Sequence, residues 1–217
     1  MGELRPTRIA CWNLNHWRQP LFPADTRRGA WEYLAGTLRA DVALLQETVP
    51  PADIARDRWV YGEIAGHRNW GSAVVAVAGD AVLEPIRSVR MAWSKRRYLL
   101  DRSYPGSVAV ARMMLPGIQP VTFVSVYGVL DVSPLASMHH VIGDLLPLFD
   151  SPDGARVILG GDLNVTTASK DERYLARTEA VLASLRALGL VEGRTLVADP
   201  PAPPRIVPVA KVPDAGT

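Results

Sequence analysis

Val157-Ile-Leu-Gly-Gly-Asp162-Leu-Asn164 joins an apolar run to two glycines and then to two oxygen-bearing side chains. The apolar part has the length and composition of a buried strand, so Asp162 and Asn164 fall where that strand ends. An earlier stretch, Val42-Ala-Leu-Leu-Gln-Glu47, repeats the arrangement with a glutamate. Oxygen-bearing side chains at the ends of two core strands indicate a site for a hard metal ion, assembled from distant parts of the chain.

The composition indicates one domain without disulfides or membrane spans. The chain has 217 residues, 48% of them hydrophobic, and its 24 basic and 22 acidic side chains nearly balance, so charge alone does not indicate a nucleic-acid partner. Cys11 is the only cysteine, which excludes an intrachain disulfide and a cysteine metal cluster, and we expect no disulfide-linked partner. No stretch reaches the ~18 apolar residues of a membrane helix, and the N-terminus lacks a signal-peptide pattern. We therefore expect a cytoplasmic protein.

The order of apolar runs predicts many strands and few helices. Besides the two runs above, strand-like segments lie at 8–12, 59–63, 71–78, 82–86, 107–114 and 121–127. Helical spacing occurs over 26–39, after Ser133-Pro134, and behind Ser169 and Glu172, which form a capping-box pattern; Gly189 ends this last helix. Because most strands follow one another through short turns, we predict an α+β fold of mixed, mostly antiparallel sheets with helices packed outside.

Polar residues follow four of the predicted strands: Asn13, Glu47, Tyr127 and Asp162, with Asn164 just beyond the last. If these ends converge, Glu47 is the better metal ligand, because Mg²⁺ needs only one or two carboxylates and takes its other oxygens from water and substrate phosphate. Asp162 would then orient and deprotonate an attacking water. Asn13 and Asn164 would hold the phosphate or the carboxylates, and the Tyr127 phenol would donate to a phosphoryl oxygen.

These segments resemble the signatures of the endonuclease/exonuclease/phosphatase superfamily, the DNase I-like proteins. The matching stretches occur in that superfamily's order and are Cys11-Trp-Asn-Leu-Asn15, Leu45-Gln-Glu47, Trp70-Gly-Ser-Ala73, Val124-Ser-Val-Tyr127 and Gly160-Gly-Asp-Leu-Asn164. The resemblance implies a four-layer α/β/β/α sandwich. It also implies a hydrolase that uses Mg²⁺, or Mn²⁺ as an alternative, to cleave phosphodiester or phosphomonoester bonds by in-line attack of water.

The resemblance further implies roles for individual residues. Asn13 and Glu47 match the positions that serve the metal, whereas Asp162 and Asn164 match the pair that serves the attacking water and the transition state. Tyr127 matches a position at which some members have tyrosine and others histidine. The expected substrate is therefore a phosphate ester, and nucleic acid, a phospholipid head group and a soluble phosphate ester are the alternatives.

The C-terminal part departs from the superfamily pattern. Members end with a further aspartate and an Asp-His pair, whereas Asp199 is followed by a proline-rich segment up to Thr217. We therefore expect a catalytic domain over residues 1–198 that lacks its last strands, and an irregular tail over 199–217. A frameshift is one hypothesis for this ending. The alternative to an active enzyme is a catalytically impaired relic, or a non-catalytic protein that binds phosphate or nucleic acid on the same scaffold.

A basic segment in the middle of the chain is a second candidate feature. Six cations lie close to Trp93 and Tyr98, with Asp101 as the only acid among them: Arg87, Arg90, Lys95, Arg96, Arg97 and Arg102. The functional interpretation is a surface that tracks phosphates with stacking aromatic rings, and the alternative is an ordinary charged loop. His16 and His67 lie in predicted turns near strand ends and are further candidates for substrate contact.

Overall fold

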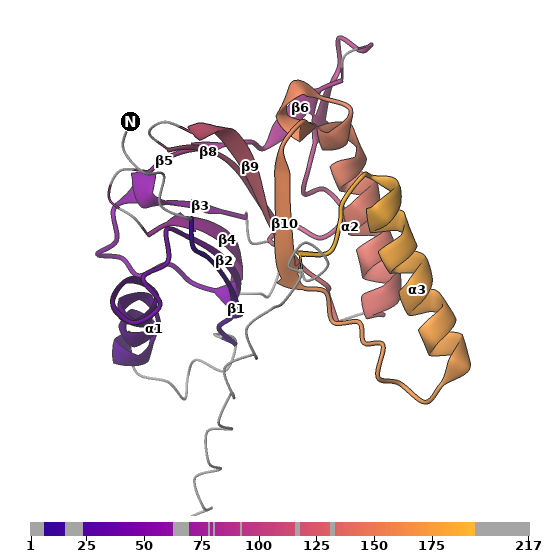
Figure 1. Ribbon diagram of the computed structural model, residues 1–217, viewed down its shortest axis with the longest axis horizontal. Coiled ribbons are helices and arrows are strands. Elements are labelled where there is room, and N and C mark those ends of the chain that lie inside the picture. Colours follow the sequence, from indigo (N-terminus) through magenta and orange to yellow (C-terminus); the bar gives the residue numbers. More distant parts are fainter. Residues whose placement is uncertain are drawn as a thin grey trace, which may run out of the picture.

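The structure, a computed structural model, describes residues 7–15, 24–62, 70–77, 79, 81–91, 93–115, 118–130 and 133–193. Two four-stranded sheets form its centre (Figure 1). The first sheet has the order β1-β2-β4-β3, with β1 (Ile9–Asn13), β2 (Val42–Thr48), β4 (Gly71–Ala76) and β3 (Trp59–Tyr61). The second has the order β10-β9-β8-β5, with β10 (Val157–Asp162), β9 (Ile118–Tyr127), β8 (Val108–Leu115) and β5 (Val82–Pro85).

Both sheets are mixed, and most of their neighbouring strands are antiparallel. Among the described strands, only β1 with β2 and β10 with β9 are parallel. The antiparallel pairs are β2 with β4, β3 with β4, β5 with β8, and β8 with β9. The predicted α+β fold of mixed, mostly antiparallel sheets is thus confirmed.

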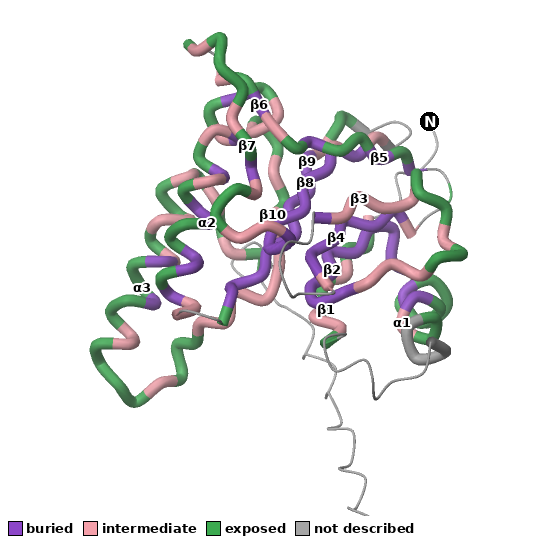
Figure 2. The backbone as a smooth tube through the Cα atoms, turned by 180° about the vertical axis from the view of Figure 1, so that it is seen from behind, coloured by how far each residue is buried: buried purple, intermediate pink, exposed green. Residues whose placement is uncertain are grey.

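Alternating side chains divide the core into three layers. On β2, Val42 and Leu44 face the second sheet, whereas Ala43 and Leu45 face outward, toward Trp31 and Leu34 of helix α1 (Ala24–Gly36). The outer face of the second sheet packs against α2 (Pro134–Phe149) and α3 (Glu172–Ala187). Buried residues accordingly concentrate on the strands and on the inward faces of the helices (Figure 2). The result is the predicted α/β/β/α sandwich.

Some helix boundaries differ from the sequence predictions. The first helix ends at Gly36 instead of continuing to residue 39, since Arg39 has a φ of 50°, which is outside the helical region. The third helix is capped by Asp171, not Ser169: the Asp171 carboxylate accepts bonds from two backbone N–H groups of the first turn. Gly189, with a φ of 83°, ends that helix as predicted.

The basic segment forms a hairpin, not a loop. Its strands are β6 (Ser88–Arg90) and β7 (Arg97–Leu99), which pair in antiparallel register. Short 3-10 turns lie at Arg56–Arg58 and Pro152–Gly154. His16, His67 and the predicted tail over 199–217 lie outside the described residues. None of the helices that the structure describes has the length and apolar character needed to cross a membrane.

Candidate active site

The carboxyl ends of the two parallel strand pairs meet at one rim of the sandwich. In the first sheet Asn13 lies opposite Gln46, directly before Glu47, and in the second sheet Asp162 lies opposite Tyr127. The two sheets approach closely here because Gly160 has no side chain: a Cβ at this position would lie 2.8 Å from Leu44 Cδ1. The rim therefore collects all four of the predicted strand ends.

Asn13 connects the two carboxylates. Its Nδ2 donates a hydrogen bond of 3.0 Å to Glu47 Oε1 and another of 2.8 Å to Asp162 Oδ2. The two carboxylate oxygens are therefore no farther apart than these two bonds placed end to end. The Asn13 amide is itself oriented, since its Oδ1 accepts a bond of 2.9 Å from the backbone N–H of Asn15.

Glu47 is the most deeply buried acidic group at this rim. Its residue is 5% exposed, and its backbone has a φ of 47° at an irregularity in the register between Leu45 and Thr48. The second carboxylate oxygen, Oε2, is buried and has no hydrogen-bond partner among the residues that the structure describes. A buried charged oxygen without a partner is costly, so this atom is suited to a cation that would neutralise it.

Asp162 and Asn164 form a tight turn at the end of β10. Asp162 Oδ1 accepts a bond of 3.0 Å from the backbone N–H of Asn164, whose φ of 52° is in the left-handed region that asparagine tolerates. Asn164 Nδ2 donates to the Gly128 carbonyl at 2.8 Å, which ties the turn to the end of β9. Both Asp162 oxygens therefore have donors from the protein, and the carboxylate has one defined orientation.

Tyr127 lies behind these groups and is only 3% exposed. The edge of its ring contacts Trp70, with the ring centroids 4.9 Å apart and the planes at 79°. Burial raises the pKa of the phenol, and the nearby carboxylates of Glu47 and Asp162 raise it further. Tyr127 is thus protonated at neutral pH and can only donate its phenolic proton to an anionic neighbour.

Gln46 and Ser125 support the site, and sequence reasoning assigned no role to either. Gln46 is fully buried, and its Nε2 donates to Ser125 Oγ at 2.9 Å. Ser125 Oγ in turn donates to the Leu45 carbonyl at 2.8 Å. This polar pair fixes β2 against β9 across the interface between the sheets. The available signal was a polar residue within the mostly apolar run of each strand.

The residues at the rim fit a Mg²⁺-type ion. Glu47 offers an unpartnered oxygen, and Mg²⁺ needs only one or two protein carboxylates because it retains several waters. Within the described part of the chain, no cluster of three or more histidine, cysteine or acidic residues could hold a metal. A zinc site, which takes three or four such ligands, is therefore not present among these residues.

Solved structures of known proteins share this architecture. The endonuclease domain of TRAS1, a telomere-specific non-LTR retrotransposon, superposes with a TM-score of 0.53 at 21% sequence identity, over 87% of this chain and 74% of that one. The chain has the DNase I-like fold. The fold that the sequence resemblance implied is thus confirmed.

Two further matches have lower scores. A humanized D. rerio TDP2 gives a TM-score of 0.48 at 16% identity, covering 86% of this chain and 68% of that one. An endonuclease/exonuclease/phosphatase family protein from Leptotrichia buccalis C-1013-b gives 0.46 at 15% identity, covering 86% and 76%. No family model and no curated protein matches the sequence.

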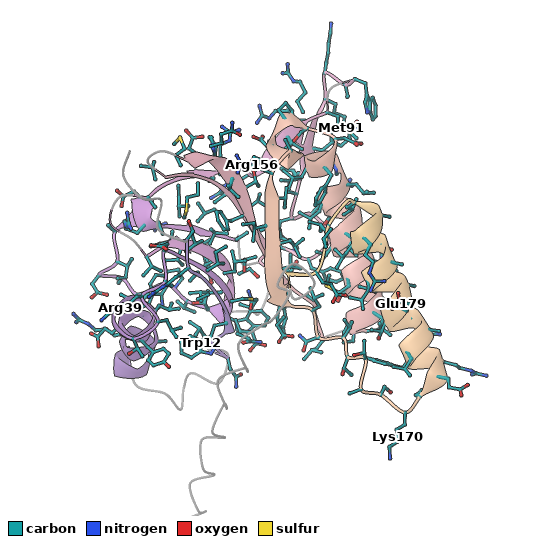
Figure 3. The ribbon with its side chains drawn as sticks, in the orientation of Figure 1. Trp12, Arg39, Met91, Arg156, Lys170 and Glu179 are labelled. Atoms are coloured by element: carbon teal, nitrogen blue, oxygen red, sulfur yellow. The ribbon has the colours of Figure 1, made fainter. Side chains whose placement is uncertain are left out.

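The basic hairpin is not part of this site. In Figure 3, Met91 in the turn of the hairpin lies at one end of the molecule, and Trp12, which directly precedes Asn13, lies toward the other. The five predicted site residues thus lie together at the rim, as their hydrogen bonds and electrostatic contacts show. The hairpin that carries the cations lies far from them.

Proposed function

We propose that this protein is a metal-dependent phosphoesterase with its active site at the Asn13–Glu47–Asp162 rim. The observation that carries the proposal is the pair of hydrogen bonds by which Asn13 holds a carboxylate from each sheet. Such a fixed pair suits phosphoryl transfer, in which catalysis consists mainly of positioning and electrostatic stabilisation.

Each residue has a role that follows from its contacts. Glu47, with its unpartnered oxygen, would hold the ion, for which we propose Mg²⁺, with Mn²⁺ as the alternative. When bound, this ion supplies Lewis-acid stabilisation of charge on the phosphoryl oxygens. Asp162, oriented by two donors, would position a water and accept its proton.

Asn13 and Tyr127 would act on the anionic groups of the site. Asn13 would keep the two carboxylates at a constant separation, and we propose that it also contributes to the metal site. Tyr127 would donate its phenolic proton in a hydrogen bond to a phosphoryl oxygen, which its raised pKa permits at neutral pH. Asn164 would help to hold the phosphate from the turn after β10, where its side chain is bonded to the Gly128 carbonyl.

The substrate class is a phosphate ester, and nucleic acid is the one to test first because the TRAS1 domain with this fold is an endonuclease. A soluble diester, bis-p-nitrophenyl phosphate, gives the most direct assay. We expect hydrolysis with Mg²⁺ that stops with a chelator and falls about 10²–10⁴-fold in Asp162→Asn, the loss typical of a removed general base. Glu47→Gln should be equally impaired, whereas Glu32→Gln, an exposed acid on α1, should retain full activity.

A second candidate function is phosphate binding without hydrolysis. It is favoured by one observation, namely that both carboxylate oxygens of Asp162 already accept hydrogen bonds from the protein, which makes this group less free to take a proton from water. Phosphate binding that depends on Glu47 and Mg²⁺, without turnover of the diester or of single- and double-stranded oligonucleotides, would support this candidate and contradict the enzyme proposal.

A further inference from the structure

The hairpin of β6 and β7 carries a dense positive charge that is not compensated by ion pairs with the described residues. Residues 88–99 contain no acidic side chain and four cations: Arg90, Lys95, Arg96 and Arg97. All four are exposed, and within the described residues none of them forms an ion pair. The nearby Arg112, by contrast, is paired with Glu84 and Asp153. The charge of the hairpin is therefore available to an anionic partner.

An exposed tryptophan occupies the turn of the hairpin. Trp93 is 73% exposed, more than any other large hydrophobic side chain among the described residues. Leu99, on the second strand, is 61% exposed. These two apolar side chains lie on the same hairpin as the four cations, and burying each of them against a partner would be worth about 1.5–3 kcal/mol.

The hairpin is anchored firmly enough to present its turn to a partner. Val89 is 2% exposed and Leu100 is 1% exposed, and both belong to the core between the second sheet and its helices. Arg97 stiffens the stem, because its guanidinium donates to Ser88 Oγ at 3.0 Å and to the Ser88 carbonyl at 3.2 Å. The Arg96 guanidinium lies over the Tyr98 ring, 5.7 Å from its centroid.

The shape and position of the hairpin distinguish between anionic partners. It projects from one end of the molecule, and β1, which ends at Asn13, lies toward the other in both views (Figures 1 and 2). Its cations are carried by the two short strands and the turn between them, and Met91 in that turn lies far from Trp12, the neighbour of Asn13 (Figure 3). A nucleic-acid strand bound in the site would therefore not run along it, since single strands are usually held in a basic groove.

We propose that the hairpin docks the protein on an anionic lipid surface, with Trp93 in the interfacial layer and the cations at the level of the head groups. Tryptophan prefers the membrane–water interface, and lysine and arginine near it are attracted by anionic lipids. This function goes beyond the proposed hydrolysis and does not depend on it, because the site lies at the other end of the molecule.

The test is sedimentation of the full chain with phosphatidylcholine vesicles, with and without phosphatidylserine. We expect binding only to the anionic vesicles, and its loss at high salt. Arg90→Gln combined with Lys95→Gln should weaken binding by about fivefold per charge, and Trp93→Ala by roughly tenfold. The matched control is Lys170→Gln combined with Arg177→Gln, which removes two exposed cations from another part of the surface and should change little.

Two further measurements complete the experiment. Brominated phosphatidylcholine in the anionic vesicles should quench tryptophan fluorescence in the wild-type protein and much less in Trp93→Phe. Diester hydrolysis should be equal in all hairpin variants, so a failure of the enzyme proposal would leave this test intact. Absence of vesicle binding, or equal binding by the hairpin and control variants, would overturn the proposal. Oligonucleotide binding that requires the hairpin, without vesicle binding, would overturn it in favour of a nucleic-acid surface.

Discussion

Asn13 is the residue on which the geometry of the site depends most directly. Replacing it with alanine would remove a donor that Glu47 and Asp162 share, and the two like charges would then repel each other without this bridge. We expect Asn13→Ala to lower kcat/KM for diester hydrolysis by about 10²–10³-fold, as for other single positioning donors. Asn15→Gly is the control. Glycine tolerates the left-handed backbone of this position and keeps the backbone N–H that donates a hydrogen bond to Asn13 Oδ1. Equal activity of Asn13→Ala and wild type would exclude this role.

Asp101 provides a prediction about pH and stability. Burial raises the pKa of its carboxyl group to about 7, despite bonds from the Gly106 N–H and the Ser107 hydroxyl. The folded state therefore holds a proton that the unfolded state releases near its ordinary pKa of 3.8. The stability that depends on this proton is present at pH 4 and is lost as the pH rises toward 7.

Between pH 4 and pH 7 we expect the free energy of unfolding to fall by on the order of 2 kcal/mol. This is less than the full change in the Asp101 pKa implies, because the side chain is partly solvated. Asp101→Asn, which imitates the protonated acid, should remove most of this slope in urea titrations at several pH values. Asp57→Asn, at an exposed position, should leave the slope unchanged. A wild-type stability that rises between pH 4 and 7, with the same slope in Asp101→Asn, would contradict the assignment.

At the scale of single elements, β10 depends on a glycine. A Cβ at Gly161 would lie 1.9 Å from the Val126 carbonyl oxygen on the neighbouring strand, and backbone there cannot move aside without breaking the parallel pair. We expect Gly161→Ala to lower the free energy of unfolding by about 3 kcal/mol. Gly143→Ala is the matched control, because its Cβ would contact nothing within 4 Å on helix α2 and should stabilise by about 1 kcal/mol. Chemical denaturation of both variants measures the difference.

The elements that the sequence predicted well are those determined by local patterns. Apolar runs identified the long strands. Gly189 identified the end of α3, because a glycine with a left-handed backbone commonly ends a helix. The cap of α3 was misassigned because Ser169 and Asp171 are both good capping residues, and tertiary context selects between them. The β6–β7 hairpin was not predicted because its strands have only three residues each and alternate poorly.

The candidate site was predictable for a different reason. Each of its residues follows or ends an apolar strand, and parallel neighbours must bring such ends together. The links across the sandwich were not predictable, because nothing in a single sequence pairs Gln46 with Ser125, 79 positions away. Likewise, the position of the basic hairpin away from the site depends on how the sheets stack, which local composition does not record.

At the scale of the whole molecule, the proposed metal site should couple ion binding to folding. The unfolded chain does not hold Glu47 and Asp162 together, so an ion that binds at the rim binds only the folded state. We expect Mg²⁺ at 100 times its dissociation constant to stabilise the fold by about 2.7 kcal/mol and to raise Tm accordingly. The entropy of unfolding grows with the size of the domain, and for a domain of this size the corresponding rise in Tm is roughly 5–10 °C.

The same unfolding experiment separates this site from nonspecific ion effects. Glu47→Gln should abolish the dependence of Tm on Mg²⁺. Its own Tm without metal should equal or exceed that of wild type, because the substitution removes a buried negative charge that the described residues only partly satisfy. Glu32→Gln, on the outer helix, should keep the full Mg²⁺ effect. If Mg²⁺ raises Tm equally in wild type and Glu47→Gln, the ion binds elsewhere, and the rim is not the metal site.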